Sequence, residues 1–193
     1  MRRTFLWAVV TLAGMGFVAP FAKSAPILLD TWYTFSFQGL GSPLAACIAP
    51  CTPGTNPPDG NPSVAAPAAP WTITTVGSSI LRVLDGFVSG DQFNIHDFAT
   101  DLGDTSAPIG GHGCGTSISC AFNDLAFSHR DYPLNPGSHS LTGTHILDPN
   151  PGAGFFEVIS AAAVPEPTSL TLLGVAVVGA SVIRLRRGRR STA

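Results

Sequence analysis

Apolar and polar residues alternate in short segments along the middle of the chain, and this pattern predicts β-strands. In segment 30–37, one face carries Tyr33, Phe35 and Phe37, whereas Trp32 belongs to the other. We expect the aromatic face to be buried, because successive side chains of a strand point to opposite faces. Similar patterns predict strands at 71–75, 80–84, 92–96, 125–128, 140–147 and 155–159.

Turn-forming and chain-breaking residues separate these segments, and no comparable helical periodicity runs through them. The stretch 41–70 holds eight of the 17 prolines, so we expect it to be a surface excursion of one domain rather than a linker between two. Glycine, serine and threonine are abundant as well. We therefore predict an all-β fold, a single jelly-roll-like β-sandwich over residues 25–163.

The N-terminus has the layout of a secretory signal peptide. Two arginines follow Met1, and an apolar run extends over 5–18, which is short for a membrane anchor. Small residues at Ala22 and Ser24 suit cleavage after Ser24. We expect residues 1–24 to be a signal peptide that directs export through the Sec machinery and is removed by signal peptidase, which leaves Ala25 as the first mature residue.

The C-terminal region combines an apolar stretch with a basic end. Residues 168–185 would form a helix about 27 Å long, close to the thickness of a bilayer core. A basic cluster at the end of this stretch predicts a transmembrane helix with a cytoplasmic C-terminus. The cluster consists of Arg184, Arg186, Arg187, Arg189 and Arg190.

Immediately before this stretch lie Pro165, Glu166 and Pro167. With the apolar helix and the basic end, they make residues 164–193 resemble the PEP-CTERM sorting signal. The resemblance implies an exosortase as a partner, an inner-membrane anchor before processing, and a final place at the cell surface or in the extracellular matrix. The alternative is a C-terminal helix packed on the domain, but five arginines are an unusual end for such a helix.

A second resemblance concerns the middle of the chain. The run from Asp85 to Phe93 reads D-G-F-V-S-G-D-Q-F. It resembles a "D-a-F-x-S-G-D-x-F" signature that recurs in a group of PEP-CTERM ectodomains, and the similarity extends over roughly residues 71–160. The resemblance implies a shared fold and carries no activity.

Charge is segregated along the chain. Between residues 25 and 163, two arginines stand against eleven acidic residues, which gives a formal charge of −9. Such a region repels phosphate backbones and has no basic stripe that could release counterions from a nucleic acid. DNA and RNA are therefore excluded as partners.

The four cysteines form two local pairs, Cys47 with Cys51 and Cys114 with Cys120. An exported protein meets an oxidising compartment, so we predict two disulfides. The alternative is a metal site that uses His112 beside Cys114, but the spacing is not that of a zinc ribbon.

Candidate catalytic chemistry is sparse. The five histidines lack the companions of known catalytic motifs, so we predict no catalytic residue, no cofactor and no enzymatic activity. Asp97, Asp101 and Asp104 lie close in sequence and are a weak candidate for a calcium site, although a solvated acidic loop explains them as well.

These features favour a non-catalytic protein of the cell surface or matrix, associated with exopolysaccharide or biofilm. The alternative is a carbohydrate-binding module of jelly-roll type. Stacking platforms for sugar rings would then be sought among Trp32, Tyr33, Trp71 and Tyr132, although aromatic residues of alternating strands are more often core.

Overall fold

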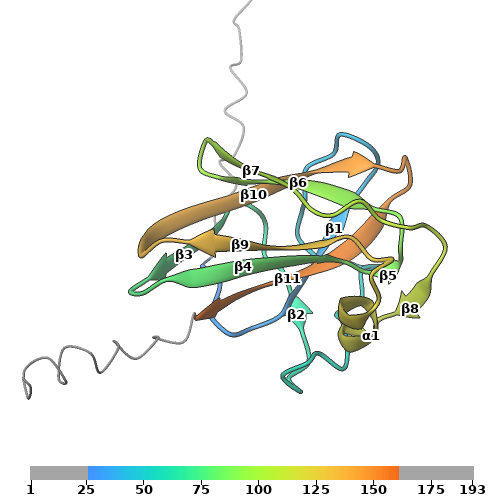
Figure 1. The fold of residues 1–193 in the computed structure, drawn as a ribbon, viewed down its shortest axis with the longest axis horizontal. Helices are drawn as coiled ribbons and strands as arrows, with labels where there is room; N and C mark the ends of the chain where they lie inside the picture. The colour runs from blue at the N-terminus through green and yellow to red at the C-terminus, as the bar shows by residue number, and fades with distance from the viewer. Residues whose placement is uncertain (1–25, 161–193) are drawn as a thin grey trace, which may run out of the picture.

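Two β-sheets stack face to face in the computed structural model, which describes residues 26–160 (Figure 1). The five-stranded sheet contains, in spatial order, β2 (Val64–Ala65), β1 (Tyr33–Phe37), β11 (Gly152–Ser160), β4 (Ser79–Asp85) and β9 (His129–Leu134). The four-stranded sheet contains β3 (Trp71–Thr75), β10 (Gly137–Leu147), β6 (Gln92–Asp97) and β7 (Thr100–Asp104). A small ribbon pairs β5 (Phe87–Val88) with β8 (Gly113–Gly115), next to the short helix α1 (Ile118–Asn123).

Strands β1, β11, β4 and β9 are antiparallel neighbours, and so are all neighbours in the four-stranded sheet. Only β2 runs parallel to its neighbour β1 among these two sheets. The predicted all-β, sandwich-like architecture is therefore confirmed.

The expected signal peptide 1–24 and the expected sorting tail 164–193 lie outside the described residues. The same holds for Pro165, Glu166, Pro167, the predicted transmembrane helix 168–185 and the arginine cluster. Among residues 26–160, no helix has the length and apolar character needed to cross a membrane.

The main core lies between the two sheets and is rich in aromatic rings. Phe35 meets Phe93 edge to face, with ring centroids 5.2 Å apart, and Trp71 stacks on Phe156 at 4.2 Å. All four side chains are at most 3% exposed. Because they come from both sheets, β1 and β11 on one side and β3 and β6 on the other, their contacts hold the two layers together.

The five-stranded sheet is also covered on its outer face. Trp32, Leu84 and Phe155 form a second core with residues of α1, such as Ile118 and Ala121. Neighbouring residues of β11 thus point into different cores, Phe155 into this one and Phe156 into the main one. Burial on two faces explains why apolar residues do not simply alternate with polar ones in this strand, in which Glu157 is the charged residue.

The strands predicted at 71–75, 80–84, 92–96, 140–147 and 155–159 all exist, with bounds that agree or extend by a few residues. The expectation for 125–128 is wrong. This segment forms a turn, and the strand lies just after it as β9.

Segment 41–70 pairs with β1 at the edge of the five-stranded sheet and contributes β2 to it. The backbone N–H of Ala45 donates to Ser36 at 2.8 Å, and the N–H of Ala66 donates to Thr34 at 2.8 Å. Between these two attachments the chain carries residues 46–52 out to one end of the sandwich, next to the turn that joins β10 to β11.

Candidate functional site

The segment Asp85–Phe93 forms a tight loop at one end of the sandwich, from the last residue of β4 through β5 into β6. Asp85 continues the inward series of Leu81 and Val83, because alternate residues of a strand share one face. Its carboxyl group is therefore buried at the end of the main core, with no exposed surface. We refer to residues 85–93 as the signature loop.

The Asp85 carboxyl group holds this loop in place by accepting hydrogen bonds from the backbone N–H groups of the loop. Oδ1 accepts from the N–H of Gly86 at 2.7 Å, and Oδ2 accepts from those of Gly90 at 3.1 Å and Asp91 at 3.2 Å. Burial raises the pKa of Asp85 to about 8 and the nearby charge of Asp91 adds to the shift, while the three N–H donors oppose it. The conformation of the loop thus depends on one buried acceptor.

The rest of the loop is fixed by Ser89 and by unusual backbone angles. The Ser89 hydroxyl donates to the carbonyl of Ile109 at 2.6 Å and accepts from the N–H of His112 at 3.0 Å. Phe87 adopts a φ of 63° and Gly90 one of 150°, both in the region where side chains are strained. These contacts give the loop one defined shape, in which Phe87 and Val88 pair with β8.

Asp91, at the end of the loop, pairs with a buried histidine of β10. Its Oδ1 lies 2.9 Å from Nε2 of His145, and the imidazole has no exposed surface and lies against Phe37 at a centroid distance of 4.3 Å. Burial raises the pKa of Asp91 to about 6, His145 opposes the shift, and the charge of Asp148 adds to it. The Nδ1 atom of His145 has no hydrogen-bond partner among the described residues.

A groove of about 880 Å³ opens beside the signature loop. One wall is formed by the loop itself and the other by residues 45–52, and the β10–β11 turn closes the end. Apolar side chains make up most of the lining as a whole, and two of them are widely exposed: Ile48 by 73% and Val88 by 57%. A volume of this size suits a small organic ligand or a few sugar units, because ligand pockets commonly measure about 300–1,000 Å³.

Two carboxyl groups, Asp91 and Asp148, are the charged side chains in the lining of this groove. Oδ1 of Asp148 accepts from the N–H and the side-chain amide of Asn150, at 2.9 and 2.7 Å. Within residues 26–160, the Oδ2 atoms of Asp91 and Asp148 have no hydrogen-bond donor assigned. A Cβ built on Gly152 would lie 2.5 Å from the ring of Phe37 and 3.2 Å from Oδ2 of Asp91, so only a glycine leaves room for these two side chains here.

Both predicted disulfides are confirmed. Cys47 is bonded to Cys51 in the wall of the groove, and Cys114 is bonded to Cys120 beside α1. The second bond removes Cys114 as a thiolate, so it does not combine with His112 as a metal ligand; His112 instead contacts Asp124 at 3.0 Å.

The structure does not gather Asp97, Asp101 and Asp104 around one point. Asp97 turns inward, where its Oδ2 lies 2.7 Å from Nδ1 of His139. Asp101 and Asp104 both accept from the amide of Asn94, at 3.0 and 2.8 Å. No group of three or more His, Cys, Asp or Glu side chains within residues 26–160 is arranged to hold a metal ion. The three aspartates are thus explained by contacts within the β6–β7 hairpin and to β10.

The aromatic residues considered as sugar platforms are buried. Trp32, Tyr33, Trp71 and Tyr132 are each at most 5% exposed. Trp32 lies in the outer core and the other three in the main core, which leaves no ring face for a ligand. The hypothesis that these four side chains stack on sugars is wrong, because each ring is packed inside one of the two cores.

Sequence reasoning missed the groove. Asp91 was noticed only as part of the signature run, and Asp148 only as one acid among eleven. The signature run itself was a signal, because residues that fix a loop and do not fill a core are often those that shape a binding surface.

Comparison with known proteins identifies the tail. Residues 163–190 match the PEP-CTERM protein-sorting motif. Searches of curated proteins and of solved structures found no match to the chain. The match begins three residues after the end of β11, so the sorting motif follows the β-sandwich directly.

Proposed function

We propose that this protein is an exported, non-catalytic protein of the cell surface or extracellular matrix that an exosortase sorts through its tail. The signal peptide 1–24 directs it to the Sec machinery, the helix 168–185 holds it in the inner membrane, and processing near Pro165 releases the β-sandwich to the envelope or matrix, where it associates with exopolysaccharide. The match of residues 163–190 to the sorting motif is the observation that carries this proposal.

Two properties of the β-sandwich support a place outside the cytoplasm. Both disulfides join cysteines close in sequence, and such bonds persist in oxidising compartments. The excess of acidic over basic residues between 25 and 163 also keeps the region soluble near anionic envelope polymers.

The absence of catalysis is supported by the environment of two of the five histidines. His139 and His145 are each paired with an aspartate but are only 7% and 0% exposed. A general acid or base must reach the reacting atoms of a substrate, directly or through one water. Their pairs therefore act as contacts that hold β10 to its neighbours β6 and the signature loop.

A carbohydrate-binding module of jelly-roll type is the second candidate. With the four aromatic platforms buried, the groove beside the signature loop is the feature that favours it. Gln38, Thr52 and Asn150 line this groove and are the side-chain types that hydrogen-bond to hydroxyl groups.

The sorting proposal is tested by following the tagged full-length chain in a bacterium that has an exosortase. Replacement of Pro165, Glu166 and Pro167 by alanine should leave the protein in the inner-membrane fraction, whereas the parent chain reaches the surface or matrix fraction. The matched control, S191A/T192A, changes the same tail outside the motif and should behave as the parent. Equal sorting of the triple-alanine chain would refute the proposal.

A further inference from the structure

The groove beside the signature loop has an electrostatic property that the fold does not use. Its two charged lining residues, Asp91 and Asp148, are both acidic, and Asp85 lies buried just behind Asp91. Each of these charges disfavours ionisation of the next, since Asp91 raises the pKa of Asp85 and Asp148 raises that of Asp91. A positive charge placed in the groove would relieve this repulsion.

Neither arginine of the β-sandwich supplies that charge. Arg82 donates to both carboxylate oxygens of Asp131 at 2.8 Å and to Glu157 at 3.1 Å, on the outer face of the five-stranded sheet. Arg130 donates to the carbonyl of Asp104 at 2.8 Å and lies over the ring of Tyr132. Both guanidinium groups are thus engaged elsewhere, and the sequence has no lysine between residues 25 and 163.

The shape of the groove argues for an organic cation instead of a metal ion. A volume of about 880 Å³ far exceeds that of an ion, and no metal-binding group of three side chains exists within residues 26–160. The walls offer apolar surface from Ile48, Pro50 and Val88, and the rim offers the amides of Gln38 and Asn150. A sugar ring is complementary to such a lining, because it has an apolar face and a hydroxyl-bearing edge.

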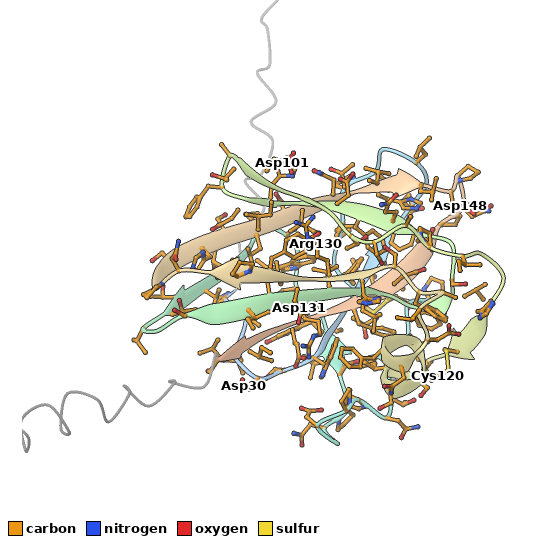
Figure 2. All side chains as sticks on the ribbon, in the orientation of Figure 1. Asp30, Asp101, Cys120, Arg130, Asp131 and Asp148 are labelled. Carbon is orange, nitrogen blue, oxygen red and sulfur yellow. A yellow bond between two sulfur atoms is a disulfide. The ribbon has the colours of Figure 1, made fainter. Side chains whose placement is uncertain are left out.

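The position of the groove suits a ligand that lies away from the membrane. β11 runs from Gly152 at the groove to Ser160, where the N–H of Ser160 donates to Asp30 at 3.0 Å. Figure 2 shows Asp148 at the right-hand end of the sandwich and Asp30 at its lower left. Nine strand residues cover about 27 Å, so the groove lies at the end farthest from the point where the chain leaves for its sorting motif.

We propose that this groove binds an amine-bearing glycan, a chain of hexosamine units with free amino groups, whose ammonium groups contact Asp91 and Asp148 while a ring face lies on the apolar wall. This inference rests on the proposed function, because it names the chemical class of the matrix polymer that the exported protein contacts. Ionic strength should weaken the binding, since both carboxylates are at least partly exposed to solvent.

The test is isothermal titration of the exported protein, purified from the surface fraction, with a glucosamine tetramer. The neutral N-acetylglucosamine tetramer and tetralysine serve as comparison ligands. We expect the glucosamine tetramer to bind at least tenfold more tightly than either one. Asp148→Asn should weaken its binding about tenfold, which corresponds to about 1.4 kcal/mol. This variant keeps an oxygen for Asn150 and suits the φ of 77° at this position, so the turn is preserved.

The matched control is Asp59→Asn, which removes the same charge from an exposed turn and should bind as the parent does. Equal binding by parent and D148N would overturn the assignment of the groove. Equal or tighter binding of the N-acetylated tetramer would overturn the requirement for a cation, and equal or tighter binding of tetralysine would overturn the choice of a glycan. Failure of all three ligands to bind would also reject the inference, whereas the sorting proposal is judged separately by where the triple-alanine chain is found.

Discussion

At the scale of single residues, Asp85 has the greatest structural influence on the signature loop. Its two oxygens accept three backbone N–H groups at 2.7 to 3.2 Å, and its side chain has no exposed surface. Few side chains could replace it, because serine has one oxygen and glutamate is longer by a methylene group. The same residue places Asp91 at the groove, so the conformation of the loop and the charge of the groove are linked.

Asp85→Asn should therefore destabilise the fold, although it replaces only one carboxyl oxygen by an amide nitrogen. The amide nitrogen cannot accept a hydrogen bond, so one or two of the three N–H donors lose their partner. We expect a loss of about 2 kcal/mol in the free energy of unfolding at pH 7, measured by urea denaturation. Asp59→Asn should change it by less than about 0.5 kcal/mol. A D85N protein as stable as the parent would contradict this account of the loop.

Buried carboxyl groups also predict how stability depends on pH. Burial raises the pKa of Asp85 to about 8, that of Glu157 to about 7 and that of Asp91 to about 6, all above the values of an unfolded chain. The folded state then binds more protons than the unfolded state between about pH 4 and pH 8, so stability falls as the pH rises through this range.

The expected result is a lower temperature of thermal unfolding at pH 8 than at pH 5, at constant ionic strength. Asp101 and Asp124, whose pKa values backbone hydrogen bonds lower, are ionised throughout this window and add no slope. In D85N the fall between pH 5 and pH 8 should be smaller. An unfolding temperature that rises with pH would show that the carboxyl groups are not desolvated as described.

At the scale of secondary-structure elements, β3 is an edge strand held by its one large aromatic residue. The ring of Trp71 is 3% exposed, stacks on Phe156 at 4.2 Å and donates from Nε1 to the carbonyl of Pro67 at 2.9 Å. It thereby joins an edge of the four-stranded sheet to the middle of the five-stranded sheet. Its role is that of a core residue and not that of a surface platform.

Trp71→Ala should accordingly cost about 3–5 kcal/mol in the free energy of unfolding, because it leaves a large cavity and removes a hydrogen bond. Chemical denaturation followed by far-ultraviolet circular dichroism would measure this. Val76→Ala, at a fully exposed position next to the end of β3, is the control and should have little effect. A stable W71A protein with reduced affinity for glycans would favour the platform hypothesis over the core assignment.

The sequence could predict those strands in which buried and polar residues alternate because only one face of the strand is buried. Strand β3 and the alternating part of β10 were found because a polar residue follows each inward residue. β9 was missed because Arg130, Asp131 and Pro133 interrupt its pattern, which an edge strand tolerates. Segment 125–128 resembles a strand because Ala126 and Phe127 are apolar, but both are buried from a turn, and Phe127 packs in the outer core.

The candidate site was harder to predict, because its parts are far apart in sequence. Asp91 and Asp148 meet only when the β10–β11 turn comes beside the signature loop, and nothing in their local sequence indicates this contact. The disulfides were predictable because each pair is local. The close sequence spacing of Asp97, Asp101 and Asp104 does not bring all three together, because Asp101 and Asp104 share the amide of Asn94 whereas Asp97 contacts His139.

At the scale of the whole molecule, the chain combines a sorting tail with an acidic β-sandwich whose groove lies at the far end. The motif at 163–190 follows β11 almost immediately, so the orientation of this strand determines which end faces the membrane before processing. Under the proposed sorting, the groove and its two carboxylates would point away from the membrane.

The mass of the intact protein from the surface or matrix fraction tests the central claim most directly. An exported and exosortase-processed chain should begin at Ala25, contain two disulfides, and end near Pro165 without the apolar stretch 168–185 and its arginines. Reduction of the two disulfides should add the mass of four hydrogen atoms. A surface protein whose mass includes the complete C-terminus through Ala193 would contradict processing of the tail, and one that retains residues 1–24 would contradict export by a cleaved signal peptide.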